Sequence, residues 1–320
     1  MDKKKLRVVF LSEFVGTVDR GVETYVLEIS KRIKRHYQLD ILTGQDSYSF
    51  KKIYSGDYDI IIPTNGRLQS LIALIVKILK KNRVIISGQS GIGKDDIWNI
   101  TFTIPDVYVA LTDSELNWAK KWVWKTSLIK IPNGVDLNKF SPIGQKARYK
   151  LEGKVVLSVG ALRWYKYHER TIRAVALTSD ISLLIAGDGP EKDKLLSLGN
   201  TLLGAKRFKI IQVDHNQIPE LYRAADLFVL PSWEREAFGI VYVEAMASNL
   251  PIVAPDDLAR REIIGNAGLF VNVKNTEKYA AAINEALQKD WKNVPRKQSE
   301  KFSWDKIALM YKDLIDSLTK

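Results

Sequence analysis

The sequence has no cysteine among its 320 residues, and only three histidines and three methionines. Without cysteine there is no disulfide, thiolate zinc site, iron–sulfur cluster or cysteine nucleophile. The histidines, His36, His168 and His215, lie far apart in the chain, so we expect no histidine-rich metal centre. These absences remove thiol chemistry and most transition-metal centres from the functions to be considered.

Long apolar runs are also missing. The longest, residues 68–79, is interrupted by Gln69, Ser70 and Lys77, and it falls short of the roughly 20 residues that a membrane-spanning helix needs. The N-terminal residues 1–5 lead directly into a short strand-like stretch and not into the core of a signal peptide. We therefore expect a cytoplasmic chain without a membrane span.

What is present indicates a folded, two-domain protein. Hydrophobic residues make up 46% of the chain and charged residues 27%, which excludes collagen-like, low-complexity and disordered classes.

Positive charge is concentrated in the first half of the chain. Residues 1–150 carry 25 Lys+Arg against 15 Asp+Glu, whereas residues 151–320 carry 24 against 22. A basic first half favours an anionic partner, such as a membrane surface, a phosphorylated acceptor or nucleic acid. A solvated lysine-rich surface is the alternative.

Two segments favour the membrane surface. Residues 114–125 read SELNWAKKWVWK after a Thr112/Glu115 capping-box spacing, so we predict a helix carrying tryptophans and lysines. Because Trp118, Trp122 and Trp124 do not share one helical face, internal packing of these rings is the alternative. The second segment, residues 68–83, has four basic residues among its last seven, and here the alternative is a core helix with a basic end.

Short apolar runs alternate with helix-length amphipathic runs along the whole chain. This alternation predicts parallel sheets covered on both faces, in two successive Rossmann-like domains with a boundary near residues 140–153. Ligands of such sheets bind beyond the carboxyl ends of the strands. The predicted strands are 7–12, 39–43, 58–63, 83–87, 107–111 and 128–131, followed by 155–159, 183–186, 208–213, 227–230, 252–254 and 269–273.

A glycine-rich loop at residues 88–94 fits the first seven positions of a nucleotide-binding P-loop. The eighth position should be Ser or Thr, but it is Asp95, whose carboxylate would repel a phosphate. Residues 96–98 are not expected to open a helix. We therefore interpret the loop as a flexible strand-end segment lining a cleft, with an ATPase as a minor alternative.

Residues 231–247 carry the main candidate chemistry. A strand leads into a polar loop, a glycine and a helix that is predicted to begin near Ile240. Glu236 then lies in the loop and Glu244 about one turn into the helix. Free backbone N–H groups at the helix start form a site for a diphosphate. Two glutamates solvated at a helix start are the alternative.

This stretch resembles the signature of the retaining glycosyltransferases of family 4, which have the GT-B fold. Five further segments are similar to that family in the same order: residues 19–23, 131–140, 159–166, 186–190 and 302–307. The resemblance implies an α/β protein of two Rossmann-like domains facing each other across a cleft. Residues 1–145 would bind the acceptor, residues 150–303 the nucleotide sugar, and a terminal helix, 304–320, would pack back onto the first domain.

The resemblance also implies roles for single residues. Glu236 would bind hydroxyls of the donor sugar and Glu244 the ribose, while Lys166 and Arg163 would neutralise the diphosphate as the glycosidic bond breaks. No metal, cofactor or covalent nucleophile is implied, since the nucleotide-diphosphate sugar is a co-substrate. The implied donor-binding residues are Gly21, Gly160, Asp188, Val213, Phe238, Gly239, Ile240 and Glu244.

Three segments depart from the family pattern. The clamp arginine is replaced by Ala161, so that Arg163 substitutes only if the loop folds differently. Arg20 stands where a glycine is usual and either adds or blocks a phosphate contact. Gln89 and Ser90 stand where the family often has a histidine on the acceptor side, so Arg20, Gln89 and Ser90 are weak acceptor-side candidates. His168 is interpreted as a surface or loop residue.

These features predict a metal-independent, retaining transferase that uses a UDP- or GDP-sugar. The expected acceptor is a sugar or a lipid-linked molecule, and the expected location is the cytoplasm, peripherally at the inner membrane face. Nucleic acid is not the anionic partner that we favour. The alternatives are a sugar-nucleotide-binding protein that has lost turnover, and a transferase acting on a soluble glycan or an anionic polymer.

Overall fold

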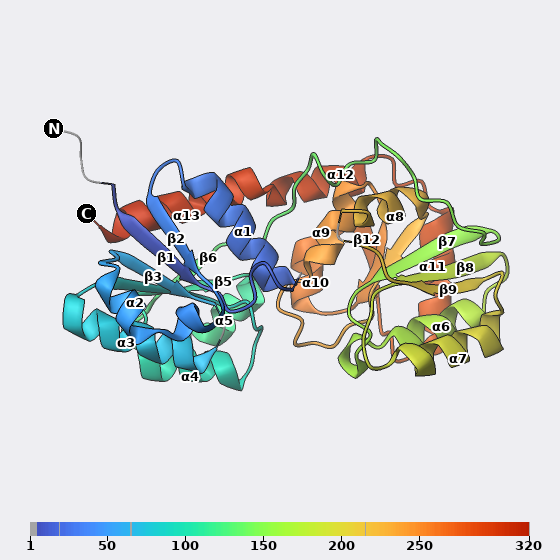
Figure 1. The fold of residues 1–320 in the computed structure, drawn as a ribbon. Helices are drawn as coiled ribbons and strands as arrows, with labels where there is room; N and C mark the ends of the chain where they lie inside the picture. Colours follow the sequence, from blue (N-terminus) through green and yellow to red (C-terminus); the bar gives the residue numbers. More distant parts are fainter. Residues whose placement is uncertain (1–4, 19, 65, 215, 320) are drawn as a thin grey trace. The chain divides into compact units, whose positions relative to one another are not determined.

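The structure is a computed structural model that describes residues 5–18, 20–64, 66–214 and 216–319. Residues 1–4, Asp19 and His215, which figure in the expectations above, lie outside the described residues. The chain divides into two compact units (Figure 1). Unit 1 comprises Met1–Gly134, Arg235–Phe238 and Trp304–Lys320, and unit 2 comprises Val135–Glu234 and Gly239–Ser303.

Unit 1 is built on a six-stranded parallel sheet with the order β2-β1-β3-β4-β5-β6. The strands are rich in valine and isoleucine, and β3 is buried along its whole length, as expected for a parallel sheet covered on both faces. The strands are β1 (Arg7–Leu11), β2 (Gln38–Leu42), β3 (Ile60–Pro63), β4 (Arg83–Ser87), β5 (Val107–Ala110) and β6 (Ser127–Lys130).

Helices cover both faces of this sheet. The first and last helices, α1 and α13, pack against each other on one face, where the Tyr25 ring lies between Phe10 and Tyr311. Helices α2, α3 and α4 contact one another in turn on the other face (Figure 1). The helices are α1 (Gly21–Ile33), α2 (Phe50–Ser55), α3 (Arg67–Lys80), α4 (Lys94–Thr103), α5 (Asp113–Ala119) and α13 (Trp304–Leu318), with a short 3-10 helix at Gly44–Tyr48.

Unit 2 holds a second six-stranded parallel sheet, with the order β12-β11-β10-β7-β8-β9. The chain runs outward in one direction from β7 and in the other direction from β10, and these two strands pair at the centre (Leu227 with Val156). The order therefore reverses between β7 and β10. The strands are β7 (Lys154–Val159), β8 (Ile181–Ala186), β9 (Phe208–Ile211), β10 (Leu227–Val229), β11 (Ile252–Pro255) and β12 (Gly268–Val271).

Helices α6, α7 and α11 bury their apolar sides on the sheet of unit 2, around a core of aliphatic residues with Phe208, Tyr279 and Trp291. On the remaining side, α9 and α12 pack closely together. The helices are α6 (His168–Ala176), α7 (Lys192–Leu203), α8 (Ile218–Ala224), α9 (Ile240–Ala247), α10 (Leu258–Ile264), α11 (Thr276–Gln288) and α12 (Val294–Ser299), with 3-10 turns at Trp164–Lys166, Gly265–Ala267 and Glu300–Phe302.

The predicted α/β class and the twelve strand positions are confirmed, with small shifts at the ends. The strand predicted over 83–87 has those bounds as β4. The strand predicted over 208–213 stops at Ile211, so that Val213 lies in the following loop. Within the described residues, no helix is long and apolar enough to cross a bilayer.

Two expectations about helices were wrong. Residues 96–98 do belong to a helix, because α4 begins at Lys94, directly after Gly93. Asp95 and Asp96 lie in its first turn, where carboxylates favour a helix start. Asp96 is buried and within 3.2 Å of the Tyr108 hydroxyl. The glycine loop therefore does connect a strand to a helix.

The tryptophan and lysine segment does not form one helix. Thr112 caps α5 as predicted, since its Oγ1 accepts a hydrogen bond from the Glu115 N–H, but the helix ends at Ala119. Residues 120–126 form turns, because the chain must reverse to enter β6. Trp118 packs against the core of unit 1, whereas Trp122 and Trp124 are exposed.

Candidate functional site

The strand order of unit 2 brings the starts of three of the predicted segments to one edge of its sheet. The clamp loop (residues 160–167) follows β7, the turn 187–190 follows β8, and the signature loop (residues 231–239) follows β10. These three strands are neighbours, and the order reverses between β7 and β10. The connections leave β7 and β10 in opposite directions there, and in open α/β sheets such a reversal is where the ligand crevice lies.

The clamp loop is joined to the turn after β8 by backbone hydrogen bonds. Gly160 N–H donates to the Ala186 carbonyl at 3.0 Å, and Leu162 N–H donates to the Asp188 carbonyl at 2.9 Å. A Cβ on Gly187 would lie 2.0 Å from the Gly160 carbonyl oxygen. The Gly-Asp-Gly sequence is therefore required for this close backbone approach, and it places exposed Asp188 beside the clamp loop.

Two cationic side chains leave the clamp loop. Arg163 is exposed, and its side chain forms no hydrogen bond or ion pair within the part of the chain that the structure describes. Lys166 ends the short 3-10 turn, is half-buried, and has its ammonium 5.9 Å from the Tyr165 ring centroid. The loop thus places one guanidinium without a partner among the described residues, and one ammonium, at the switch point of the sheet, where the strand order reverses.

His168 was expected to be a surface or loop residue, and this was wrong, because it is the first residue of α6. Its side chain is buried beneath the clamp loop, where Nδ1 lies 3.1 Å from Ser158 Oγ and Nε2 lies 3.3 Å from the Ala161 carbonyl. Because a carbonyl only accepts, Nε2 carries the proton and Nδ1 accepts from the Ser158 hydroxyl. Burial lowers the pKa of His168 to about 4, so a neutral imidazole holds the loop in place.

Helix α9 begins at Ile240, as predicted, and its N-cap Gly239 has a left-handed backbone with φ 76°. No side chain of the described residues caps this helix start. Among the described residues, no acceptor pairs with the amides of Gly239 or Ile240. Uncapped amides at the positive end of a helix dipole form a site for an anionic group. Phe238, which precedes them, is buried.

Glu244 does not behave as a solvated glutamate at a helix start, so that alternative is wrong for this residue. The side chain is almost completely buried, and its Oε2 accepts a hydrogen bond from the Tyr222 hydroxyl at 3.0 Å. Burial raises the pKa of Glu244 to about 7. Glu236, earlier in the signature loop, is half-buried.

Sequence reasoning missed Arg260, a residue of α10 that binds the signature loop. Its guanidinium is buried, pairs with Asp257 at 2.6 Å, and donates to the carbonyls of Ser232 (3.4 Å) and Trp233 (2.6 Å). Arg260 thereby fixes the start of the signature loop. The sequence offers only an Asp257-x-x-Arg260 spacing, which is typical of an exposed helix start.

In unit 1, Arg20 and Gly21 lie at the start of α1. Arg20 is the N-cap, its guanidinium bonds the buried Glu23 carboxylate at 3.0 Å, and it lies 4.6 Å from the Phe14 ring centroid. Gly21 is exposed. The arginine that replaces a glycine is thus partly neutralised by its own helix.

Gln89 and Ser90 differ in their surroundings. Gln89 forms a reciprocal amide pair with Asn133, with bonds of 3.0 and 2.9 Å, and also donates to Ser87 Oγ. Ser90 is exposed. Of these two acceptor-side candidates, the glutamine thus ties the loop to residue 133, whereas the serine is open to solvent.

Beneath this loop lies a buried group of acids. The Tyr108 hydroxyl is 2.7 Å from Glu115 Oε1 and 3.2 Å from Asp96 Oδ2, and Glu115 also accepts from the Leu111 N–H at 2.7 Å. Burial raises the pKa of Glu115 to about 8 and that of Asp96 to about 7. A Cβ on Gly88 would lie 1.8 Å from the Glu115 carboxylate, so the loop packs directly on this group.

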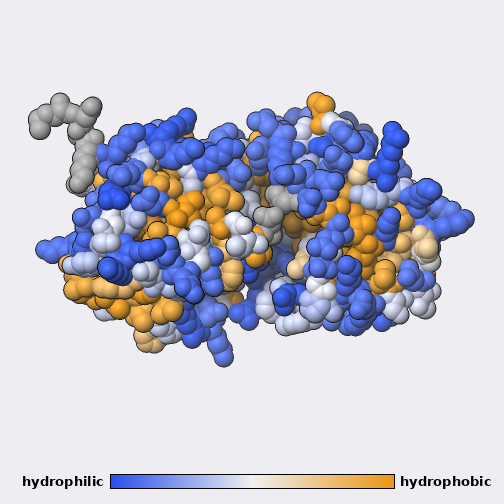
Figure 2. Space-filling view, viewed as in Figure 1, coloured by the Kyte–Doolittle hydropathy of each residue, from blue (hydrophilic) through white to orange (hydrophobic). Residues whose placement is uncertain are grey.

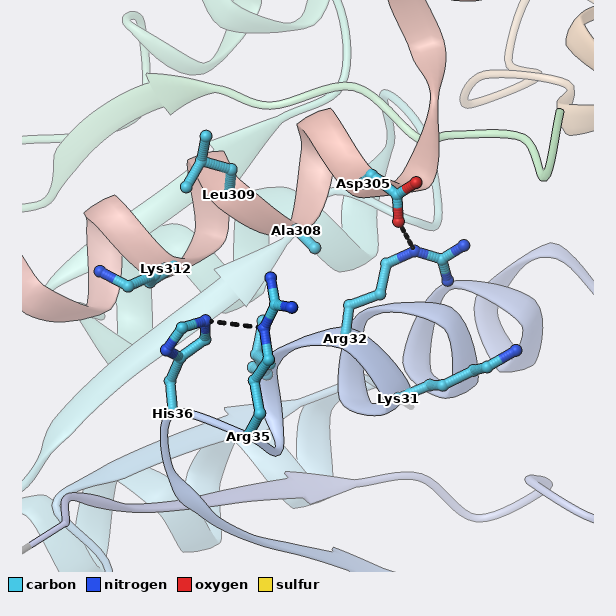
Figure 3. A pocket seen from close by; sticks show the side chains of 9 residues that line it. Lys31, Arg32, Arg35, His36, Asp305, Ala308, Leu309 and Lys312 are labelled. Atoms are coloured by element: carbon cyan, nitrogen blue, oxygen red, sulfur yellow. Dashed lines mark hydrogen bonds and ion pairs between the residues drawn. The ribbon is translucent and has the colours of Figure 1, made fainter.

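A basic pocket of about 500 Å³ opens between the last turn of α1 and α13 (Figure 3). Most of its cations already have partners within unit 1. Arg32 Nε donates to Asp305 at 2.7 Å, Lys312 pairs with Asp316 at 2.7 Å, and Arg35 Nε donates to His36 Nε2 at 3.0 Å. A 13-residue helix spans about 20 Å, so this pocket is remote from Gly21. It is not part of the candidate site.

A family model described as glycosyl transferases group 1 matches residues 142–303, which is half of the chain. The chain belongs to the glycosyl transferases group 1 family. The match covers the clamp loop, the turn after β8 and the signature loop, so the family's sequence pattern and the switch point of unit 2 coincide.

Relatives of this group 1 chain include enzymes named for lipid acceptors. The phosphatidyl-myo-inositol mannosyltransferase of Mycolicibacterium smegmatis is 34% identical over 194 residues, which is 57% of this chain and 48% of that protein. An N-acetylgalactosaminyltransferase of Campylobacter jejuni, named for a diphospho-undecaprenol acceptor, is 33% identical over 187 residues, 55% of this chain and 50% of that protein. The chain spans about half the length of these curated relatives.

Solved structures confirm the predicted fold. The Anabaena HepE protein, solved in complex with UDP, matches with a TM-score of 0.79 at 18% identity over 98% of this chain and all of that chain. A sucrose-phosphate synthase of Thermosynechococcus elongatus matches with a TM-score of 0.84 at 19% identity, over 98% of this chain and 99% of that chain. The group 1 chain therefore has the two-domain α/β fold of the GT-B glycosyltransferases.

Proposed function

We propose that this group 1 chain is a retaining glycosyltransferase that moves a sugar from a UDP- or GDP-sugar to an acceptor, without a metal ion. One observation carries the proposal. At the switch point of unit 2, the uncapped amides of α9 and the cations of the clamp loop follow neighbouring strands. Amide dipoles and cations in such a crevice are suited to a diphosphate.

The proposed reaction breaks the bond between the anomeric carbon of the donor sugar and the diphosphate oxygen. Lys166, Arg163 and the α9 amides stabilise the negative charge that develops on the leaving nucleoside diphosphate, the work that a metal ion would otherwise do. The acceptor hydroxyl forms the new bond on the same face, and its proton passes to the leaving phosphate oxygen. Glu236 holds hydroxyls of the donor sugar.

Substitution of Lys166 and Glu236 tests this proposal. We expect Lys166→Ala and Glu236→Ala each to lower the rate of transfer at least about 100-fold, because each removes a charged contact to the reacting groups. The measurement is turnover with a panel of UDP- and GDP-sugars, in the presence of EDTA to test metal independence. Lys206→Ala is the matched control, because Lys206 is an exposed unit 2 lysine outside the three loops.

The possible outcomes separate the alternatives. Wild-type rates in both variants would contradict the site, and loss of all turnover in EDTA would contradict metal independence. A wild-type protein that binds UDP or GDP but neither transfers nor hydrolyses any donor would instead be a sugar-nucleotide-binding protein that has lost turnover. Unfolding temperatures equal to wild type would show that the variants fold.

We further propose a lipid-linked acceptor at an anionic membrane surface. The relatives named for phosphatidyl-myo-inositol and diphospho-undecaprenol support this class of acceptor. Unit 1 also carries a surface suited to a bilayer, the α3 face, formed by aliphatic side chains whose exposed fractions range from 38% to 70%. These side chains are Leu68, Leu71, Ile75, Ile78 and Leu79.

The α3 face continues onto both neighbouring helices. Exposed aromatic rings of α2 (Phe50 and Tyr54) and of α4 (Phe102) extend it, and Figure 2 shows apolar side chains gathered over this part of unit 1, at lower left. A contiguous apolar surface of this kind marks an interaction site. It is a different surface from the tryptophan and lysine segment near residue 122.

Cations without acidic partners border the α3 face. Lys51, Lys81 and Lys94 are exposed, and none forms an ion pair with a described residue. Lys80 and Arg67 are engaged with Asp57 and Asp95 respectively. An apolar surface bordered by free lysines suits a bilayer with anionic head groups better than a neutral one.

A further inference from the structure

Four aromatic side chains of unit 2 gather where the clamp loop meets the start of the signature loop. The Trp233 ring stacks on Tyr165, with centroids 5.1 Å apart, and meets the edge of Trp164 at 5.3 Å. Trp164 also makes edge contacts with Tyr165 at 5.6 Å and Tyr167 at 6.5 Å. These rings, Trp164, Tyr165, Tyr167 and Trp233, are called the aromatic platform below.

Hydrogen bonds and a cation–π contact hold the rings of the platform in place. The backbone N–H of Trp233 donates to the Tyr165 carbonyl at 3.0 Å, which joins the two loops. The buried Arg260 binds the Trp233 carbonyl, and the Arg170 guanidinium lies 3.7 Å from the Tyr167 ring centroid. Because these contacts already fix the rings, little conformational entropy is lost when a ligand covers them.

Trp164 is the open member of the platform. Its exposed fraction is 59%, although its ring edges touch three other aromatic rings. The neighbouring rings thus orient the indole without covering it. Rigid, partly exposed aromatic rings supply large contact areas at low entropic cost.

The position of Trp164 in the chain indicates which part of a nucleotide sugar would lie nearest to it. Trp164 lies between Arg163 and Lys166, the cations proposed to hold the diphosphate. In a nucleotide sugar the sugar ring is bonded directly to the diphosphate, whereas the base is separated from it by the ribose. A pyranose has an apolar C–H face that packs on an indole while its hydroxyls stay hydrogen-bonded.

We propose that the aromatic platform binds a pyranose ring by stacking against Trp164. This inference rests on the proposed function for the place of the diphosphate. The ring comes either from the donor sugar or from a sugar of the acceptor, and the chemistry of recognition is the same for both. Trp164 is therefore a binding residue that selects ligands with an exposed apolar sugar face.

The test compares Trp164→Ala and Trp164→Phe with wild type in the full chain. In the donor arm, calorimetry compares UDP-glucose with UDP and GDP-mannose with GDP. In the acceptor arm, methyl α-glucopyranoside and methyl α-mannopyranoside are titrated in the presence and absence of UDP or GDP. Trp124→Ala is the matched control, because Trp124 is a comparably exposed tryptophan (66%) in unit 1.

We expect Trp164→Ala to weaken binding about fivefold or more in one of the two arms, and Trp164→Phe to restore part of it, because a smaller ring still stacks. The arm that changes identifies the source of the pyranose. Trp124→Ala should change neither arm. UDP and GDP alone should bind all variants equally.

Three results would overturn the inference. The first is a sugar-dependent affinity that Trp164→Ala leaves unchanged in both arms, and the second is wild-type protein that binds no pyranose in either arm. The third is an equal loss of affinity for UDP or GDP without the sugar, which would make the platform a base-binding surface. If UDP and GDP fail to bind even wild type, the proposed function fails, while the methyl glycosides still decide the platform.

Discussion

At the scale of single residues, burial decides which side chains of a motif reach a ligand. Glu244 occupies the motif position implied to bind ribose, yet its carboxyl is buried against Tyr222. From the sequence, His168 was interpreted as a surface or loop residue, yet its buried imidazole binds Ser158 and the Ala161 carbonyl and so fixes the clamp loop. Neither arrangement can be seen in the spacing of residues, because both depend on where α6 and α8 pack.

The buried acids beside the glycine loop predict a pH dependence of stability. Burial raises the pKa of Glu115 to about 8, above its ordinary value near 4.5 in the unfolded chain. Between these values the folded state binds more protons than the unfolded state, so the contribution of Glu115 to stability is fully present below pH 4.5 and is lost as pH rises to 8. Acid conditions therefore favour the folded state at this site.

Glu115→Gln removes this titration. We expect wild type to lose at least about 1 kcal/mol of unfolding free energy, compared with Glu115→Gln, between pH 5 and pH 8. The reason is that the pKa of Glu115 differs by more than one unit between the folded and the unfolded state. Urea denaturation at several pH values measures it. Asp113→Asn, at an exposed residue of the same helix, is the control. Parallel pH curves for wild type and Glu115→Gln would contradict the raised pKa.

At the scale of elements, the sequence predicted the strands well and the short helices less well. Buried parallel strands are runs of Val, Ile and Leu on both faces, which is why β4 was predicted with its observed bounds. Helix α4 was missed because its first turn is polar, and its buried contacts, such as Asp96 with Tyr108, are not local. Helix α5 was extended too far because the turn into β6 carries no Gly or Pro.

The candidate site was predictable where the backbone itself imposes a residue type. The Gly-Asp-Gly turn must be glycine-rich because it touches the clamp loop, and Gly239 adopts a left-handed backbone before α9. Arg260 and the aromatic platform were not predictable. The partners of Arg260 in the signature loop, Ser232 and Trp233, lie 28 and 27 residues away in the chain. Trp233 is separated from Tyr167 by 66 residues and from Trp164 by 69.

The α3 face belongs to this scale, because it is a property of one helix and its two neighbours. We expect wild-type protein to float with liposomes that contain anionic lipid and to bind neutral liposomes more weakly. Replacement of both Ile78 and Leu79 by Asn should reduce binding to anionic liposomes at least about fivefold, since two exposed apolar side chains leave the contact. Flotation assays measure both effects.

Leu258→Asn is the matched control, because Leu258 is the most exposed leucine of unit 2. Trp122→Ala with Trp124→Ala tests the tryptophan and lysine segment as the rival surface. Failure of wild type to bind either liposome would remove the membrane from the proposal. Loss of binding only in the tryptophan variant would move the contact from the α3 face to that segment.

At the scale of the whole molecule, charge and family pattern are unevenly divided. The family model covers residues 142–303, most of unit 2, whereas the basic excess lies in residues 1–150. This division is consistent with the proposed diphosphate site in unit 2 and the proposed acceptor contacts in unit 1. The α3 face, Gln89 and Ser90 all lie in unit 1.

The central claim is that unit 2 grips a diphosphate. The most direct measurement is calorimetry of the full chain with UDP against UMP and GDP against GMP, in wild type and Lys166→Ala. We predict that wild type binds the diphosphate of the preferred base at least about tenfold more tightly than its monophosphate, and that Lys166→Ala loses most of this preference. Equal binding of mono- and diphosphates by wild type, or an unchanged preference in Lys166→Ala, would contradict the account.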